Sequence, residues 1–409
     1  MKGGNTHLTD LSLTTRYLER KLAFQLGAAT LARIVLNTAR RFIYPFTSVL
    51  SRGLGVPLTA ITSLVAVNQV TGMLSPLFGP LSDRWGYRRM MLAGLLMLAG
   101  GMLIGGLLPI YAAVLLALFL AGLGKSIFDP ALQAYVGERV LYRHRGLAIG
   151  LIELSWAGSS LLGIPLVGLL MERAGWRSPF FLLGGLGLLG AGVLGLLIPA
   201  KSHRQDASVA TGFRETWRQL SRERAAIGAL GFALLISAAN DNLFIVYGAW
   251  LEKAFGLSTV ALGTATLVIG AAELLGEGIT ATIADRIGLK RAVAAGVALS
   301  ALSYALLPWM GSTLPLALLG LFIAFLTFEF TIVTAFSLFT EVLPRTRATM
   351  MSATVAAASL GRVIGALIGG PVWLTGGLMT TGLLSAVISA LALACLFWGL
   401  RGWRASAAL

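Results

Sequence analysis

Ionisable side chains recur deep inside the long apolar stretches of this chain, far from any polar loop. A charge at the centre of a lipid bilayer costs at least about 2.5–3.5 kcal/mol, so residues placed there are candidates for function. The cost falls where the side chain faces a watery cavity or an opposite charge, which is the chemistry of solute binding and proton transfer. Eleven residues have this placement: Arg33, Arg40, Arg41, Lys125, Arg362, Asp129, Glu153, Asp241, Glu273, Glu277 and Glu329.

Their spacing predicts that several of these residues share a helix face with other polar side chains. One such stripe comprises Arg33, Asn37, Arg40, Arg41, Tyr44 and Ser48, which recur at helical intervals. Two shorter stripes comprise Ser237, Asn240, Asp241 and Phe244, and Lys125, Asp129 and Gln133. At about 1.5 Å per residue, Arg40, Lys125, Asp241 and Glu329 lie about 16–20 Å from the nearest charged rim residue. That depth is the middle of a membrane.

The composition requires lipid, not water, around most of the surface. Of 409 residues, 56% are hydrophobic and 12% charged, with a mean hydropathy of +0.82; an average soluble protein has about 25% charged residues. A soluble enzyme is excluded. A nucleic-acid-binding protein is excluded too, despite a formal net charge of +15, because the basic residues occupy short loops. The chain has one cysteine, three histidines outside the apolar stretches and no ATP-binding P-loop. We therefore expect no enzyme activity, metal or cofactor.

The predicted fold is an all-α integral membrane protein with 12 transmembrane helices. About 20 apolar residues cross the hydrocarbon core as a helix, and bare backbone cannot face lipid. The predicted spans are 22–51, 57–81, 89–108, 110–137, 146–171, 178–199, 225–251, 258–283, 290–310, 314–341, 348–372 and 376–400.

These spans divide the chain into two bundles of six helices, residues 22–199 and 225–400. The remaining segments are an N-terminal segment 1–21, a linker 200–224 and a tail 401–409. If both termini are cytoplasmic, 23 of the 32 Lys and Arg lie in cytoplasmic segments and 4 lie outside. The positive-inside rule therefore predicts cytoplasmic termini, with the protein in the plasma (inner) membrane.

An internal repeat of about 202 residues relates the two bundles. The segment Asp83-Arg84-Trp85-Gly86-Tyr87-Arg88-Arg89 recurs as Asp285-Arg286-Ile287-Gly288-Leu289-Lys290-Arg291, and Glu138…Arg145 recurs as Glu341…Arg347. Six spans between the copies restore the starting orientation, so the bundles are parallel repeats. Such repeats place a binding site between them, near the membrane midplane.

The first of these segments, extended back to Gly79, resembles the loop signature G-x-L-x-D-R-x-G-x-R/K-R/K of the major facilitator superfamily. The second copy departs from it at Ala281. The resemblance covers the whole chain and implies alternating access, in which the two halves rock about a cavity lined by spans one, four, seven and ten. A Gly/Pro-rich run in span five is similar to a motif of drug:proton antiporters, although its adjacent Gly-Pro and Gly-Gly pairs are missing. Leu118 also stands where proton-coupled members carry an arginine in span four.

The stripes and this resemblance together predict a substrate-binding cavity. Its expected lining residues are Asn37, Arg40, Arg41, Tyr44, Lys125, Asp129, Asn240, Asp241, Phe244 and Glu329. The alternative is that static ion pairs, Lys125 with Asp129 and Arg40 with Asp241, fasten the helices together. Arg33 is expected to snorkel or to pair with the inner loops.

The carboxylates at membrane depth are the proton-carrier candidates. They are Glu153, Asp241, Glu273, Glu277 and Glu329. For Glu273 and Glu277 an alternative is a structural cluster with Arg362 where the halves meet.

The repeated loop signature predicts a gating network at the cytoplasmic ends of the helices. Its members are Asp83, Arg84, Gly86, Arg88, Arg89, Arg145, Asp285, Arg286 and Arg347. Several weak surface pairs acting together are needed to bias the equilibrium, because each contributes only about 0–1 kcal/mol. Alternatively, these charges anchor the loops at the lipid headgroups.

The function predicted from these features is proton-coupled export of amphipathic small organic molecules by a monomer. Its partners are then the small-molecule substrate, protons and the lipid bilayer. One alternative is an organic-anion symporter or exchanger that binds its substrate through Arg40, Arg41 and Lys125. Another is a membrane receptor or scaffold that transports nothing.

Overall fold

The computed structural model describes residues 5–140, 142–199, 222–343 and 347–403, and within these ranges it contains helices and no strand. The side chains of residues 5–20, 76, 79–80, 83, 142–147, 285 and 348 are outside the description. Most of the predicted linker and tail also lies outside it.

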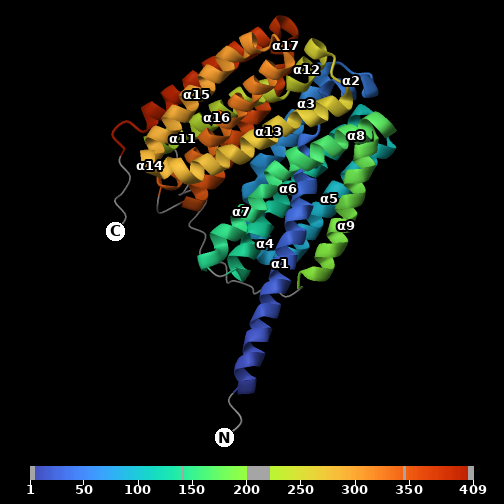
Figure 1. Cartoon of the computed structure of the whole chain (residues 1–409), viewed down its shortest axis with the longest axis vertical. Helices are drawn as coiled ribbons and strands as arrows, with labels where there is room; N and C mark the ends of the chain where they lie inside the picture. Colours follow the sequence, from blue (N-terminus) through green and yellow to red (C-terminus); the bar gives the residue numbers. More distant parts are fainter. Residues whose placement is uncertain (1–4, 141, 200–221, 344–346, 404–409) are drawn as a thin grey trace.

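Two groups of helices, coloured blue to green and yellow to red, form the two halves of the molecule (Figure 1). The N-terminal half contains α1 (Asn5–Arg41), α2 (Thr47–Leu54), α3 (Leu58–Val70), α4 (Ser75–Trp85), α5 (Tyr87–Leu107), α6 (Tyr111–Arg139), α7 (Tyr142–Gly158), α8 (Ile164–Ala174) and α9 (Ser178–Leu197). The 3₁₀ helix η1 (Thr71–Leu74) joins α3 to α4, and the π-helix η2 (Ser159–Gly163) joins α7 to α8.

The C-terminal half contains α11 (Arg224–Phe244), α12 (Tyr247–Phe255), α13 (Thr259–Ile279), η3 (Thr280–Ala284), α14 (Asp285–Ile287), α15 (Leu289–Met310), α16 (Leu314–Thr340) and α17 (Arg347–Gly399). Within α17, Gly377 has φ 62° and ψ −152°, which separates two helical segments where the last two spans were predicted. Among the described residues, ten helices are long and apolar enough to cross a membrane, or eleven if the bent pair Thr47–Leu54 and Leu58–Leu74 is one span. The count of twelve stays a prediction.

The backbone carries the internal repeat that the sequence predicts. Glycines with positive φ occur in pairs about 201–202 residues apart: Gly55 and Gly256 (φ 65° and 64°), Gly86 and Gly288 (φ 86° and 84°), and Gly175 and Gly377 (φ 84° and 62°). An L-residue with a side chain rarely adopts this conformation, so glycine is required where both halves turn in the same way. The local turns of one half are therefore reproduced in the other.

Two predicted spans are broken in the middle, and this corrects the sequence analysis. The predicted helix 22–51 ends at Arg41, and α2 begins at Thr47 after a turn that contains Pro45. Likewise, the predicted helix 225–251 ends at Phe244, and α12 begins at Tyr247. Tyr44 and Ser48 thus do not continue the helical stripe of Arg33. Because α1 ends at membrane depth, Arg40 and Arg41 lie at the negative end of its macrodipole.

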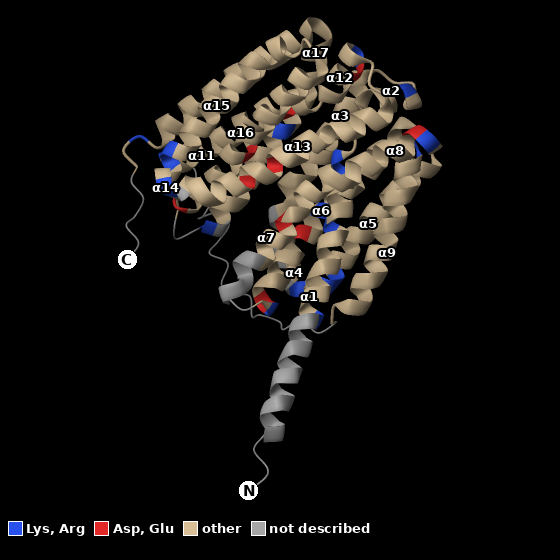
Figure 2. Cartoon of the chain, viewed as in Figure 1, with Lys and Arg blue, Asp and Glu red and all other residues tan. Residues whose placement is uncertain are grey.

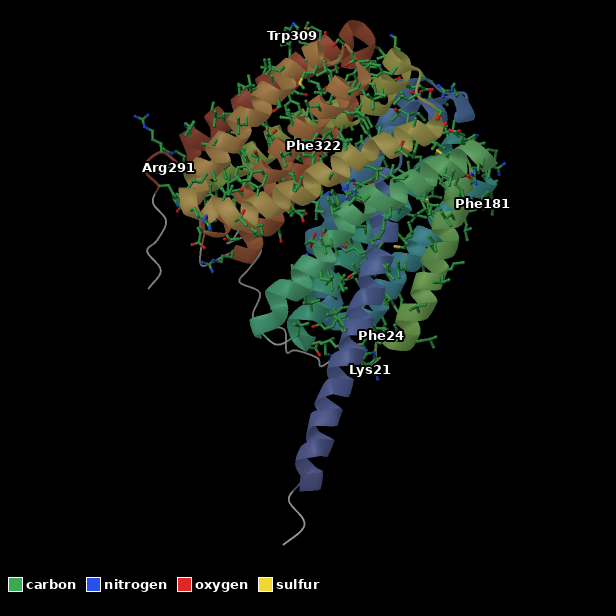
Figure 3. The ribbon with its side chains drawn as sticks, viewed as in Figure 1. Lys21, Phe24, Phe181, Arg291, Trp309 and Phe322 are labelled. Atoms are coloured by element: carbon green, nitrogen blue, oxygen red, sulfur yellow. The ribbon has the colours of Figure 1, made fainter. Side chains whose placement is uncertain are left out.

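Large apolar side chains on the outside of both halves match a surface solvated by lipid. Trp309 is 62% exposed and Phe181 41%, and both lie at the outer surface in Figure 3. Charged residues also lie in the interior of the molecule, between the two halves (Figure 2). The exterior is therefore apolar, as lipid requires, and charged side chains are enclosed within a mainly apolar interior.

The two halves meet closely at one end, the far end, where α2 turns at Gly55 and α12 at Gly256. They run apart toward the other end, the linker end, where α9 ends and α11 begins (Figure 1). At the far end, Arg52 Nη2 lies 2.6 Å from Glu252 Oε1. A Cβ on Gly248 would lie 2.1 Å from the carbonyl oxygen of Pro45. The far end closes because glycine lets the two backbones approach.

This approach predicts the effect of a side chain at Gly248. With Cys395→Ser as background, cysteines at Arg52 and Glu252 should be joined by a short bifunctional crosslinker. Gly248→Val should lower the crosslinking yield strongly, because its side chain cannot fit against Pro45. Gly100→Val is the control, since no atom lies within 4 Å of a Cβ at Gly100. An unchanged yield in Gly248→Val, measured by gel mobility, would contradict this packing.

Candidate functional site

A buried ion pair joins the two halves at the C-terminal end of α1. Arg41 of α1 donates to both carboxylate oxygens of Glu273 on α13, with Nη1 at 3.2 Å from Oε2 and a closer contact from Nη2 to Oε1. The two side chains are 3% and 4% exposed. Ser160 of η2 donates to the same carboxylate at 3.0 Å. Two elements of the N-terminal half therefore hold one carboxylate of the C-terminal half.

The Arg41 guanidinium also stacks on aromatic rings from both halves. It lies 4.5 Å from the Trp156 ring centroid and 5.6 Å from that of Phe244. Cations within about 6 Å of a ring face are attracted by its quadrupole. The ion pair is thus enclosed by aromatic side chains, which keeps water from competing with it.

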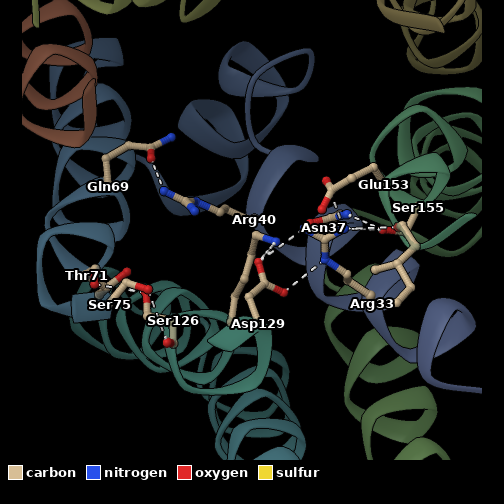
Figure 4. A network of polar contacts seen from close by, with 12 residues as sticks. Arg33, Asn37, Arg40, Gln69, Thr71, Ser75, Ser126, Asp129, Glu153 and Ser155 are labelled. Carbon is tan, nitrogen blue, oxygen red and sulfur yellow. Dashed lines mark hydrogen bonds and ion pairs between the residues drawn. The ribbon is translucent and has the colours of Figure 1, made fainter. Parts of the chain in front are cut away.

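A chain of hydrogen bonds forms a second link between the halves. Tyr44 Oη donates to Asp241 Oδ1 at 2.8 Å, and Gln69 Nε2 donates to Tyr44 Oη at 2.6 Å. Arg40 Nη2 donates in turn to Gln69 Oε1 (Figure 4). The proposed direct pair of Arg40 with Asp241 is therefore wrong: two neutral side chains stand between them.

A third cluster lies within the N-terminal half (Figure 4). Lys125 Nζ lies 2.6 Å from Asp129 Oδ2, which confirms that pair. Arg33 lies 3.0 Å from Asp129 and 3.0 Å from Glu153. The expectation that Arg33 snorkels or pairs with loops is wrong, because α6 and α7 supply its two carboxylates. Asn37 donates to Ser155 at 3.2 Å on the same face.

Aromatic side chains meet between the halves beside these links. The Tyr44 and Phe244 rings stack at 4.1 Å, and Phe244 also contacts Tyr247 at 5.5 Å and Phe325 at 5.0 Å. Asn240 accepts a hydrogen bond from Tyr304 at 3.2 Å. The predicted site residues Tyr44, Asp241 and Phe244 are thereby brought together.

The remaining acidic candidates lie on the Glu273 side of the interface. Glu329 of α16 is 8% exposed. A Cβ added to Gly276 would lie only 2.9 Å from the Cβ of Glu329, so the two helices are in close contact there. Glu277 is half-buried one turn beyond Glu273. The alternative prediction that Glu273 forms a cluster with Arg362 is wrong, because the partner of Glu273 is Arg41.

Gln69 and Ser160 are site residues that the sequence analysis missed. Gln69 had a signal, since Asn68 and Gln69 form a polar pair within an otherwise apolar span. The sequence gives no such signal for Ser160, because a serine hydroxyl in a membrane helix often bonds to the backbone of its own helix. Among the described residues, no group of three His, Cys, Asp or Glu could hold a metal ion.

The gating candidates lie at the linker end, and the structure describes only part of them. Arg84 and Arg286 are exposed, and Arg89 lines a 310 Å³ pocket beside Gly86. Arg88 donates to the carbonyl of Gly195. Arg347 lies 3.1 Å from Glu341. The side chains of Asp83, Arg145 and Asp285 lie outside the described residues.

The chain belongs to the Major Facilitator Superfamily, whose family model matches residues 29–366 and 230–406. A similar relative is the uncharacterized MFS-type transporter YceJ of Bacillus subtilis (strain 168), 27% identical over 71% of this chain and 74% of that protein. The class C tetracycline resistance protein of Escherichia coli is 27% identical over 58% of this chain and 60% of that one. The protein is thus a member of a transporter family and contains helices that can span a membrane.

Solved structures show the same fold at low sequence identity. A bacterial homolog of the human lysosomal transporter Spinster, in an inward-facing and unoccupied conformation, matches with a TM-score of 0.75. It is 16% identical, and the match covers 93% of this chain and 97% of that one. The nucleoside transporter NupG matches with a TM-score of 0.78 at 13% identity, over 93% of this chain and 99% of that one.

The burial of the Arg41–Glu273 pair predicts a large cost when it is broken. Glu273→Ala should lower the free energy of unfolding by about 3–5 kcal/mol, because Arg41 is left buried without a partner. The double variant Arg41→Ala, Glu273→Ala should lose less than the sum of the single variants.

The matched control is the Arg52–Glu252 pair, which also joins the halves but is 63% and 23% exposed. Breaking it should cost only about 0–1 kcal/mol. Thermal and denaturant unfolding of protein in nanodiscs measures both cycles. Equal, additive losses in the two cycles would contradict the role of burial.

Proposed function

We propose that this protein is a secondary active transporter that exports amphipathic small organic molecules by alternating access, driven by protons. The observation that carries the proposal is the buried Arg41–Glu273 pair between the halves. A carboxylate is the group in this link that can accept a proton. Protonation removes the negative charge that holds Arg41, so the strongest polar link between the halves weakens.

The location of the link supports a coupling role. It lies between the halves, so any rocking of α1 against α13 must break or rearrange it. A charge stripped of its partner in a low-dielectric interior is costly, so the halves separate there only when Glu273 is neutral or Arg41 finds another anion. Glu329 and Glu277, on the same side of the interface, are the carboxylates from which a proton reaches Glu273.

The arrangement of the halves supports an inward-facing conformation. The far end is closed by Gly248 against Pro45 and by the Arg52–Glu252 pair, whereas the halves diverge toward the linker end. The charge distribution predicts that the linker end, with both termini, is cytoplasmic. The protein then acts as a monomer in the inner membrane, with its 200–224 linker inside.

The aromatic side chains around the links support an amphipathic substrate. Trp156 and Phe244 offer ring faces next to the buried Arg41, and Phe325 packs against Phe244. The similarity to a tetracycline resistance protein supports export and a drug-like substrate. The second candidate, organic-anion transport, is favoured by one observation: Arg40 is bonded to the neutral Gln69 and not to a carboxylate.

The test is the response of the conformation to pH. Spin labels at the linker ends of the two halves should report a shift in their distance distribution between about pH 8 and about pH 5.5, the range in which a proton carrier working near neutral pH must change its charge. Glu273→Gln mimics the protonated side chain. It should give at pH 8 the distribution that the wild type gives at low pH.

The control is Glu223→Gln, an exposed carboxylate at the start of α11, which should respond to pH as the wild type does. A wild-type distribution that is indifferent to pH, or a Glu273→Gln variant that still responds fully, would refute proton coupling through this link.

A further inference from the structure

Two basic side chains between the halves have no carboxylate partner among the residues that the structure describes. Of the five basic residues within the predicted spans, Arg33, Arg41 and Lys125 form ion pairs. Arg40 and Arg362 form none with any described residue, since no carboxylate oxygen lies within the 4.0 Å that defines such a pair. Arg40 bonds to an amide, and its Nε is buried without a hydrogen-bond partner.

These two cations come from opposite halves and lie in the same region of the interface. Arg40 ends α1, and Arg362 lies in α17 of the C-terminal half. A Cβ on Gly72 would lie 3.4 Å from Arg40 Nη2 and 2.5 Å from the hydroxyl of Ser359, which precedes Arg362 by one helical turn. The Arg362 guanidinium lies 5.8 Å from the Trp156 ring centroid, on the ring that Arg41 also contacts. An anion that contacts both guanidinium groups would offset the cost of burying them unpaired.

The carboxylate beside Arg362 is already engaged by another side chain. A Cβ on Gly365, one turn after Arg362, would lie 2.9 Å from the Cβ of Asp241, and Asp241 Oδ1 accepts a hydrogen bond from Tyr44. Glu329 lies against Gly276 of α13, on the Glu273 side of the interface. Among the described residues, neither arginine therefore has a carboxylate at contact distance.

We infer that Arg40 and Arg362 bind the carboxylate of a monoanionic aromatic substrate whose ring lies against Trp156. This rests on the proposed function and names its substrate class. Trp156 is half-buried, and its ring lies near cationic groups of both halves. One carboxylate held by guanidinium groups of both halves gives each arginine the charged partner that it lacks, and a ring on Trp156 accounts for the amphipathic character.

This assignment changes which basic residues bind the anion. Arg41 and Lys125 already have carboxylate partners at contact distance, so a substrate would have to displace Glu273 or Asp129 to reach them. Arg40 and Arg362 are reached without breaking an ion pair. Because the two arginines lie in different halves, the bound anion becomes a third link between the halves.

The experiment compares three probes of similar shape and different charge: 2-naphthoate, 2-naphthamide and 2-naphthylmethylamine. Thermal shift and calorimetry on the full-length protein in nanodiscs should show stabilisation by naphthoate and none by the amide or the amine, since binding to the folded state raises apparent stability. Probes are used up to about 10 mM, above the ~1 mM dissociation constant of a weak ligand.

Arg362→Gln should weaken naphthoate binding about tenfold or more, because a hydrogen-bonded charge is lost. Arg362→Lys should recover part of it. Arg401→Gln is the matched control, since Arg401 is exposed at the linker end. Each variant is first compared with the wild type for its unliganded unfolding temperature.

Stabilisation by the amine or the amide equal to that by naphthoate, no stabilisation by naphthoate at all, or full affinity in Arg362→Gln would overturn the inference. The pH response that depends on Glu273 needs no ligand. If naphthoate fails and that response remains, the anion site is refuted while proton-coupled transport stands. If the pH response fails as well, both proposals fall.

Discussion

The buried ion pair between Arg41 and Glu273 is the contact on which the relation of the two halves depends. It joins the end of α1 to the middle of α13, with Ser160 as a further donor and Trp156 over the guanidinium. In water such a pair contributes little, but in a low-dielectric interior separation of the charges is expensive. The two halves are therefore held together by a charge pair that must break or rearrange before they can separate at this point.

The rest of the interface has two kinds of contact: close approach of the backbones and links between polar side chains. At the far end, Gly248 lets the backbone of α12 approach Pro45. At the level of Arg41, side-chain links replace backbone contact, and the two chains of interactions through Glu273 and Asp241 run side by side. Toward the linker end the halves diverge (Figure 1). Rocking about the far end would thus stress the polar links first.

The sequence predicted the family, the two halves and the placement of the charged residues because these follow from hydropathy, spacing and an internal repeat. The sequence did not predict which side chains the charged residues contact. Arg40, Arg41 and Arg33 all lie on α1, and only the packing of α3, α13 and α6 decides that they meet Gln69, Glu273 and Asp129 respectively. The breaks after Arg41 and Phe244 were missed because apolar side chains continue through both turns, so hydropathy alone does not reveal them.

Difference infrared spectroscopy of the protein in nanodiscs, between about pH 8 and about pH 5.5, tests most directly whether Glu273 takes up the proton. The method detects the C=O stretch of a carboxyl group that becomes protonated. We predict a carboxyl band that Glu273→Gln removes and that Glu277→Gln and Glu329→Gln leave in place. A band unchanged in Glu273→Gln would contradict the account.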